Sequence, residues 1–224
     1  MHLLIDGDDT LWENNVHFER AVEEFIDRLR HSRLSRQEVR ALLDDVERAN
    51  LASHGYGSHA FARNLRQTYI QLAEREPDEE ELAAVEALGH RIREEPLQLI
   101  DGVSETLAEL AGRHELLLLT KGHVDEQLVK VEASGLREHF ADVVVVAEKE
   151  VRVYRQIVAE RRLDRERTWM VGNSPRSDIN PALAAGLGAV FVPHPATWRL
   201  EHEELVASPR LIVLDSFRQL TARF

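Results

Sequence analysis

The chain has 224 residues, contains no cysteine and carries a formal net charge of −12. This length suits one large domain, or a core domain with a smaller insert. The absence of cysteine excludes disulfides, thiolate metal sites and a cysteine nucleophile. The acidic balance argues against nucleic acid and against an anionic membrane surface as partners, because both attract basic patches. A small phosphorylated metabolite remains compatible, since the local charge of a pocket governs its binding.

Targeting signals are not evident in the sequence. The N-terminus lacks a basic stretch followed by an apolar segment, so no signal peptide is expected. The longest apolar runs, such as residues 116–119 and 143–147, are far too short to span a bilayer. Together with the lack of cysteine, these features favour a cytoplasmic location.

The first predicted element is a strand that leads into a cluster of carboxylates. Leu3-Leu4-Ile5 is a short apolar run, and Asp6, Asp8 and Asp9 follow it within four positions. Such a run predicts a buried strand, with the acids placed where it leaves the sheet. Like charges this close repel unless a cation joins them. The cluster could therefore hold Mg²⁺, provide a carboxylate nucleophile beside a carboxyl acid, or form a plain aspartate-rich turn.

The stretch from residue 15 to residue 95 is predicted to be entirely helical. Apolar residues recur there at helical spacing in four segments, within 22–29, 39–46, 61–72 and 82–88. The acidic run 78–81 suits the N-terminus of the last of these helices. We therefore expect a helical insert of domain size, beginning just beyond the carboxylate cluster.

Beyond Pro96, short apolar strands alternate with helices. This alternation predicts βαβ units and an α/β fold with a doubly wound, mainly parallel sheet. The domain assignment that follows is a core of residues 1–14 and 96–224 with the insert at 15–95. The predicted strands are 115–119, 142–147, 168–171, 189–192 and 211–213, and the predicted helices are 104–111, 124–133, 153–162, 179–185 and 217–222.

Polar residues follow four of the predicted strands. In a doubly wound sheet, ligands bind outside the carboxyl ends of the strands, so these residues are expected to converge. They supply carboxylates, a hydroxyl, an ammonium and an amide, a set that suits a phosphoryl group held against Mg²⁺. Each alone has an ordinary explanation as a helix cap, a surface lysine or a turn residue. In chain order they are Asp6 and Asp8, Thr120, Lys149, and Asn173 with Asp178.

The ordered set resembles the haloacid dehalogenase superfamily of hydrolases, in particular its phosphatases. The resemblance implies a Rossmann-like sheet, and the helical insert is similar to that family's first-position cap, a mobile lid. The matching motifs are Asp6-x-Asp8-x-Thr10 after the first strand, Thr120 after the second, Lys149 after the third, and the Gly172-Asn173 loop with Asp178 after the fourth.

The resemblance also implies roles for the matching residues. Asp6 would be the nucleophile that forms an aspartyl phosphate, and Asp8 the general acid and then the base. Mg²⁺ would be bound by the Asp6 and Asp178 carboxylates and the backbone carbonyl of Asp8. Thr120 and Lys149 would hold the phosphoryl oxygens.

Two positions depart from the family pattern. Asn173 stands where an acid usually follows the glycine, so we expect it to orient a metal-bound water through its amide oxygen rather than to bind the metal directly. The stretch after Lys149 lacks a proline that is often found there. Asp9 lies between two motif positions and is given no catalytic role.

The leading interpretation is a Mg²⁺-dependent phosphatase that acts on a small phosphomonoester. A 2-haloacid dehalogenase of the same fold would need neither a metal nor the second aspartate, so Asp8 and Asp178 argue against it. A phosphomutase, which shields its aspartyl phosphate from water, stays open. A non-catalytic phospho-accepting switch is disfavoured by the long insert after the first strand. The oligomeric state is not indicated by any pattern in the sequence.

One segment of the insert interrupts its helical pattern. Residues 53–59 read Ser-His-Gly-Tyr-Gly-Ser-His, and glycine permits tight turns and close approach of a ligand. His54 and Tyr56 can both pack and hydrogen-bond, so they are candidates for selecting the leaving group. An ordinary glycine-rich turn between two helices is the alternative.

Overall fold

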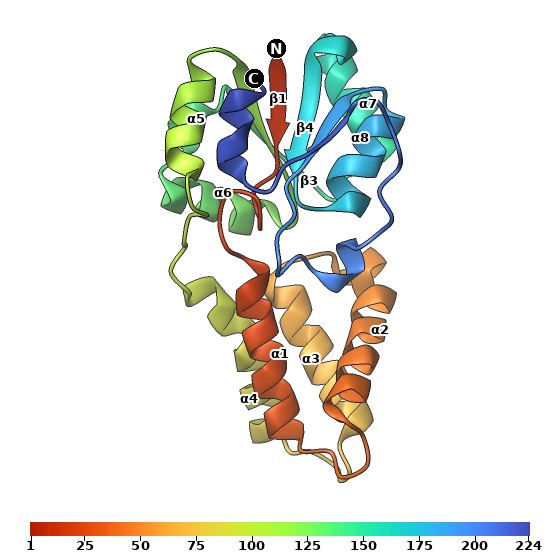
Figure 1. Cartoon of the computed structure of the whole chain (residues 1–224). Helices are drawn as coiled ribbons and strands as arrows, with labels where there is room; N and C mark the ends of the chain where they lie inside the picture. The colour runs from red at the N-terminus through yellow and green to blue at the C-terminus, as the bar shows by residue number, and fades with distance from the viewer. The chain divides into compact units, whose positions relative to one another are not determined.

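The structure is a computed structural model that describes all 224 residues. It contains two compact units, one formed by residues 1–15 and 97–224 and the other by residues 16–96 (Figure 1). The second unit begins and ends one residue later than the insert proposed from the sequence. Each unit has a hydrophobic core of its own.

The first unit is built on a six-stranded sheet in the order β3-β2-β1-β4-β5-β6, with every pair of neighbours parallel. The predicted α/β, Rossmann-like fold is confirmed, and the sheet is wholly rather than mainly parallel. β1 is central because it pairs with both β2 and β4. The strands are β1 (His2–Ile5), β2 (Glu115–Lys121), β3 (Asp142–Val146), β4 (Thr168–Gly172), β5 (Gly188–Phe191) and β6 (Leu211–Val213).

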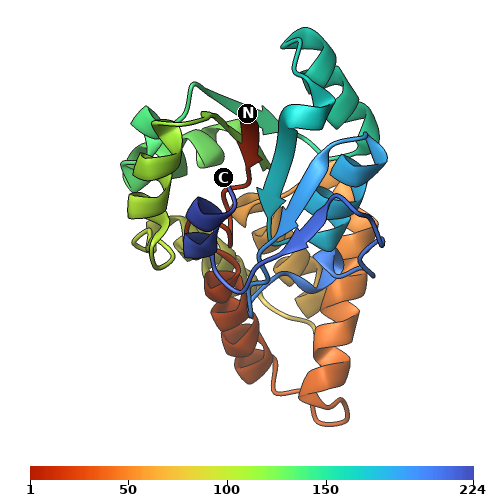
Figure 2. The ribbon, with the colours of Figure 1, turned by 45° about the horizontal axis from the view of Figure 1, so that its top comes forward.

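Side chains of the central strands alternate between two apolar layers. Leu116 and Leu118 of β2 pack in one layer, and Leu117 and Leu119 pack in the other. Full burial of each such side chain contributes roughly 1.5–3 kcal/mol. Helices α5 (Val103–Ala111) and α6 (Val124–Ser134), with the 3₁₀ helix η6 (Phe217–Ala222), cover the first face; α7 (Val151–Glu160) and α8 (Asn180–Ala184) cover the second (Figures 1 and 2).

The segment after β4 differs from the helix predicted at 179–185. A π-type turn, Pro175–Ile179, comes first, and α8 then runs for only five residues. The predicted C-terminal helix is a 3₁₀ helix. Turns of the π type are rare and occur often at functional sites, and this one carries Asp178. The remaining 3₁₀ helices of this unit are η2 (Arg137–His139), η3 (Arg165–Arg167) and η5 (Arg199–Glu201).

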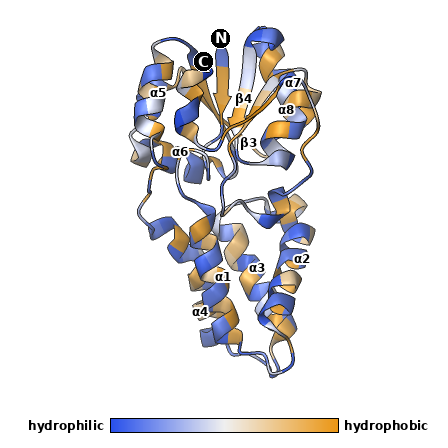
Figure 3. Cartoon of the chain, in the orientation of Figure 1, coloured by the Kyte–Doolittle hydropathy of each residue, from blue (hydrophilic) through white to orange (hydrophobic).

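The second unit consists of helices only. Their apolar sides meet in a core that includes Phe25, Leu43, Leu65 and Val85. Figure 3 shows that each of these helices carries both hydrophilic and hydrophobic residues along its length. None of the helices combines the length and the hydrophobicity that a membrane-spanning segment needs. The elements are α1 (Asn15–Leu29), α2 (Arg36–His54), α3 (Ser58–Leu72), α4 (Glu79–His90) and the 3₁₀ helix η1 (Arg91–Glu94).

Helix boundaries in the second unit follow from capping. Ser35 and Asp78 each form a capping box with the glutamate three residues later, so orphan backbone N–H groups at the starts of α2 and α4 are satisfied. The interruption expected over residues 53–59 is shorter than predicted. Only residues 55–57 lie outside helices, because α2 continues to His54 and α3 starts at Ser58.

The two glycines of this short connection have positive φ angles, +67° at Gly55 and +100° at Gly57. Such values are readily adopted only by glycine, which explains the sequence of the turn. His54 is exposed and Tyr56 is partly buried.

Candidate active site

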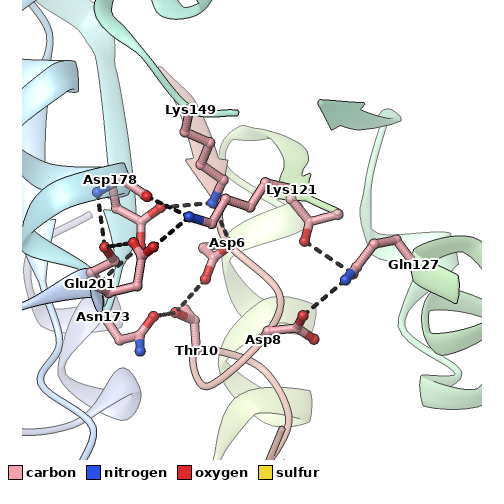
Figure 4. Close-up of polar contacts among 12 residues, drawn as sticks. Asp6, Asp8, Thr10, Lys121, Gln127, Lys149, Asn173, Asp178 and Glu201 are labelled. Atoms are coloured by element: carbon pink, nitrogen blue, oxygen red, sulfur yellow. Dashed lines mark hydrogen bonds and ion pairs between the residues drawn. The ribbon is translucent and has the colours of Figure 1, made fainter. Parts of the chain in front are cut away.

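Lys149, Asp6 and Asp178 form the buried centre of the site, at the carboxyl ends of β1, β3 and β4 (Figure 4). The ammonium of Lys149 donates to a carboxylate oxygen of Asp6 and, at 2.7 Å, to Oδ1 of Asp178. All three are nearly inaccessible to solvent, with exposed fractions of 3%, 6% and 0% respectively. The sheet thus brings together three residues that lie far apart in the sequence.

One ammonium does not balance the charge of two buried carboxylates. Burial raises the pKa of Asp6 to about 7, and repulsion from Asp178 adds to the rise, while Lys149 opposes it. Burial also disfavours the charge on Lys149, but attraction to both carboxylates outweighs it and raises the pKa of Lys149. The centre therefore favours the approach of a further cation or the retention of a proton.

The position of Asp178 depends on a glycine at the end of β4. A Cβ atom added to Gly172 would lie 2.2 Å from Oδ2 of Asp178, so no other residue fits beneath this carboxylate. The same oxygen accepts a hydrogen bond of 3.0 Å from the backbone N–H of Ser174. Gly172 and the π-type turn together orient the Asp178 carboxylate toward the Lys149 ammonium.

Asn173 presents its amide oxygen to the centre of the site. Its Nδ2 donates to Oγ1 of Thr197 at 2.8 Å, and that hydroxyl in turn donates to the His194 carbonyl at 2.9 Å. Because the Thr197 hydroxyl donates its proton to the His194 carbonyl, its oxygen can only accept a hydrogen bond from the Asn173 side chain. The group that faces Thr197 is therefore the amide NH₂, and this fixes the orientation of Asn173. The amide oxygen lies 3.2 Å from the Thr10 hydroxyl, which is also 3.2 Å from Oδ2 of Asp6.

Asp8 belongs to a second polar group, beside the first (Figure 4). Its carboxylate accepts hydrogen bonds from Trp12 Nε1 at 2.7 Å, Gln127 Nε2 at 2.9 Å and Lys130 Nζ at 2.8 Å. Burial alone would raise the pKa of Asp8, but the charge of Lys130 and these hydrogen bonds outweigh it, and the pKa is lowered. In this arrangement Asp8 is an ionised carboxylate directed toward α6.

Thr120 connects to the same group. Its hydroxyl donates to Oε1 of Gln127 at 3.1 Å, and the amide nitrogen of Gln127 binds Asp8. Thr120 is buried at the end of β2, as the strand-end argument requires. To bind a phosphoryl oxygen, its proton must turn from Gln127 to the ligand.

The structure therefore brings together the six core residues singled out in the sequence, in two adjoining groups. His54 and Tyr56 belong to the helical unit. Residues that contact the site but carry no motif were missed, because they lie on a helix face or several residues beyond the end of β5. They are Gln127, Lys130, Thr197 and Glu201.

The oxygen atoms of the central group fit a hard cation. Asp6 and Asp178 provide carboxylates with excess negative charge, and Asn173 directs an amide oxygen inward. Mg²⁺ prefers ligands of this kind. Asp6, Asp178 and the backbone carbonyl of Asp8 are the groups that could hold it, with the Asn173 amide oxygen beside them.

Asp9, Glu13 and His194 form another cluster, with potential ligand atoms within 4.8 Å of one another. Asp9 already accepts hydrogen bonds from the backbone N–H groups of Asn14 and Asn15. An imidazole nitrogen also suits borderline metals better than Mg²⁺. The geometry explains Asp9 as a residue that fixes the start of α1.

Comparison with known proteins settles the family. A family model described as haloacid dehalogenase-like hydrolase matches residues 1–186. The chain belongs to this family of hydrolases. The resemblance drawn from the four motifs is thereby confirmed.

Two curated proteins align with part of this hydrolase. Phosphoserine phosphatase from Thermus thermophilus is 33% identical over 105 residues, covering 45% of this chain and 41% of that protein. The putative HAD-hydrolase YfnB from Bacillus subtilis is 31% identical over 116 residues, covering 49% of each. The matched part thus spans less than half the length of these relatives.

Solved structures resemble the hydrolase over its whole length. A haloacid dehalogenase-like family hydrolase from Xanthomonas campestris has 31% identity and a TM-score of 0.87, covering 100% of this chain and 90% of that one. YfnB, described as bound to magnesium, has 19% identity and a TM-score of 0.70, covering 99% and 97%. An L-2-haloacid dehalogenase from Xanthobacter autotrophicus shares the fold at 18% identity and a TM-score of 0.62, covering 99% and 96%.

The charge imbalance predicts that Asp6 destabilises the folded protein. Between its unfolded pKa near 3.8 and its folded pKa of about 7, only the folded state retains the Asp6 proton, so stability falls as the pH rises through this window. Asp6→Asn should therefore raise Tm in metal-free buffer at pH 8, by several degrees, since each kcal/mol shifts Tm by roughly 2–4 °C at this size.

The gain should shrink as the pH falls toward and below the unfolded pKa of 3.8, because Asp6 then becomes neutral in both states. Asp215→Asn, a change at an exposed carboxylate of the same unit, is the control and should not alter Tm. Calorimetry between pH 3 and pH 8 measures the Tm of the wild type and of both variants. A lower Tm for Asp6→Asn than for wild type at pH 8 would contradict the conclusion that the Asp6 charge destabilises the folded protein.

Proposed function

We propose that this hydrolase is a Mg²⁺-dependent phosphatase that cleaves a small-molecule phosphomonoester through an aspartyl phosphate on Asp6. The observation that carries the proposal is the pairing of Asp6 and Asp8, two residues apart at the end of β1, with Lys149 and Asp178 against Asp6. A nucleophile next to a buried ammonium and within reach of a second carboxyl group suits phosphoryl transfer.

The proposed reaction has two displacements at phosphorus. An Asp6 carboxylate oxygen attacks, the bond from phosphorus to the ester oxygen breaks, and the leaving alkoxide takes a proton from Asp8. Asp8, now a carboxylate, removes a proton from water; the hydroxide attacks phosphorus, and the bond to Asp6 breaks to release inorganic phosphate. Asp8 ends the cycle protonated, as it began.

The state in which Asp8 is drawn toward Gln127 and Lys130 matches its role as a base, because it is ionised there. To act as the acid, Asp8 must leave Lys130 and carry a proton. Lys149 and the Thr120 hydroxyl would balance the charge of the phosphoryl oxygens. Mg²⁺ held by Asp6, Asp178 and the Asp8 carbonyl, with Asn173 beside it, would supply further neutralisation of those oxygens.

Two relatives support this assignment. One is a phosphoserine phosphatase and another is described as bound to magnesium. Proteins named haloacid dehalogenases share the fold, and the competing reaction is displacement of a halide by Asp6. That reaction has no leaving alcohol to protonate, so it gives no role to Asp8. A phosphomutase is the second alternative, and it differs in returning the phosphoryl group to a sugar instead of to water.

The proposed partner is a small phosphorylated metabolite, with no nucleic acid or membrane partner.

The direct test is phosphate release from a panel of sugar phosphates, nucleotides and phosphorylated acids. Wild-type protein should release phosphate with Mg²⁺, lose activity in EDTA and recover it when Mg²⁺ is restored. Asp6→Asn should abolish turnover, since the nucleophile is lost. Asp101→Asn, at an exposed ion pair with Arg218, is a matched control that should retain activity. Turnover by a folded Asp6→Asn protein, or full activity without metal, would overturn the proposal.

Asp8 is expected to matter most for poor leaving groups. Asp8→Asn should slow hydrolysis of an alkyl phosphate by roughly 10²–10⁴-fold, the usual contribution of an acid–base group. With p-nitrophenyl phosphate, whose leaving group needs little protonation, formation of the aspartyl phosphate should be slowed much less. Pre-steady-state burst measurements give the rate of aspartyl phosphate formation with each of the two substrates. Equal slowing of the burst with the two substrates would argue against Asp8 as the acid.

His54 and Tyr56 are proposed to contribute to substrate selection. His54→Ala or Tyr56→Ala should change the order of substrate preference, measured as kcat/KM over the panel. Acetyl phosphate should be hydrolysed almost as before, because it offers little beyond the phosphoryl group. A uniform effect on every substrate, or none at all, would count against this role.

A further inference from the structure

A segment after β5 holds the loop that carries Asn173 and Asp178. We call residues 194–206 the strap; it contains η5. The strap contacts the 173–180 loop at four successive places. Thr197 accepts a hydrogen bond from Asn173, and Glu201 accepts one from Ser174. The Leu200 carbonyl accepts a hydrogen bond from Arg176. The Asn180 side chain donates to Glu203 and to the Glu204 carbonyl, and accepts from the backbone N–H of Val206.

Glu201 is the buried charge of the strap, with 6% of its surface exposed. One carboxylate oxygen accepts from Lys121 Nζ at 2.5 Å and the other from Ser174 Oγ at 2.5 Å. Ser174 Oγ also accepts from the Ser177 backbone N–H at 2.9 Å. The carboxylate thus fixes the Ser174 side chain, which in turn fixes the first turn of the loop that ends at Asp178.

Lys121 extends the connection to the other strand ends. It directly follows Thr120, and its ammonium lies 2.8 Å from Ser177 Oγ and 3.4 Å from Glu148 Oε1. The same Glu148 oxygen accepts the backbone N–H of Lys149 at 3.1 Å. Lys121, the last residue of β2, therefore contacts the segments that follow β3, β4 and β5.

We infer that Glu201, acting through Lys121 and Ser174, is a positioning residue that holds Asp178, Asn173 and Thr120 in register for the reaction. For its catalytic consequence, this inference rests on the proposed function. Glu201 bonds Lys121 and Ser174, so it acts on the carboxylates of the site through the residues that hold them.

Stability alone does not explain a buried ion pair at this place. Removing two charges from water costs about as much as their attraction returns, and apolar side chains of similar volume are often equally stable. The partners of Glu201 are the Ser174 hydroxyl of the loop and the ammonium of Lys121, the residue next to Thr120. The Glu201 charge therefore lies where it can control the conformation of the 173–180 loop and the position of the end of β2.

The test uses the full-length protein and isosteric changes. Glu201→Gln keeps the shape and a hydrogen-bonding oxygen but removes the charge; Lys121→Met removes the ammonium; the double variant removes both. Glu166→Gln is the matched control, because Glu166 forms an ion pair of 2.6 Å with Arg210 in the same unit, away from the site. For each protein, kcat, KM and Tm are measured, together with hydrogen exchange of peptides covering residues 173–180.

Glu201→Gln should lower kcat by roughly 10–100-fold, as loss of a supporting contact does in comparable sites. KM should change little, because the affected interactions strengthen in the transition state. Exchange should accelerate in the 173–180 peptides. Tm should fall in each single variant, because one buried charge is left unpaired, and should recover at least in part in the double variant. The double variant should be no slower than the slower single variant, since the two residues act as one unit. Glu166→Gln should match wild type in kcat and in exchange.

Wild-type kcat in Glu201→Gln, unchanged exchange in the loop, or losses that multiply in the double variant would each overturn the inference. A rise in KM with unchanged kcat would also overturn it, since that pattern marks a substrate contact. If the wild-type protein hydrolyses no phosphomonoester, the proposed function fails instead. The exchange of the 173–180 peptides then still decides whether Glu201 holds the loop.

Discussion

The ammonium of Lys149 lies between two buried carboxylates, and much of the core unit is arranged to permit this contact. Asp6, Lys149 and Asp178 come from the ends of three strands, which a parallel sheet places at one edge. Gly172 leaves room for the Asp178 carboxylate, and a π-type turn directs it inward. The residual negative charge that Lys149 does not cancel makes the same place receptive to a cation.

Helix α6 supplies the second half of the site. Gln127 touches both Thr120 and Asp8, and Lys130 binds Asp8 and the Asn14 side chain. The residue proposed to shuttle protons is therefore held by a helix on the surface of the sheet, while the proposed nucleophile is held by strand ends. The two carboxylates, only two positions apart, have pKa values shifted in opposite directions because their neighbours differ.

The sequence was sufficient for the parallel sheet and for the residues at or shortly after the ends of strands, because strand ends converge whatever the details of packing. Asp6, Thr120, Lys149 and Asp178 were found in this way. Lys130 resembles an ordinary helix lysine, and Glu201 lies among other acids in a loop, so neither carries a local signal. The orientation of Asn173 depends on Thr197, which only the folded chain brings near. The π-type turn likewise has no periodic pattern to reveal it.

The central place of β1 has a consequence for the order of folding. Its partners β2 and β4 begin more than 100 and 160 residues later in the chain. During synthesis the first strand must wait, unpaired, while the helical unit is made and can close through its own shorter-range contacts. We expect the sheet to assemble only when β4 has left the ribosome, so the acidic residues after β1 acquire their neighbours late.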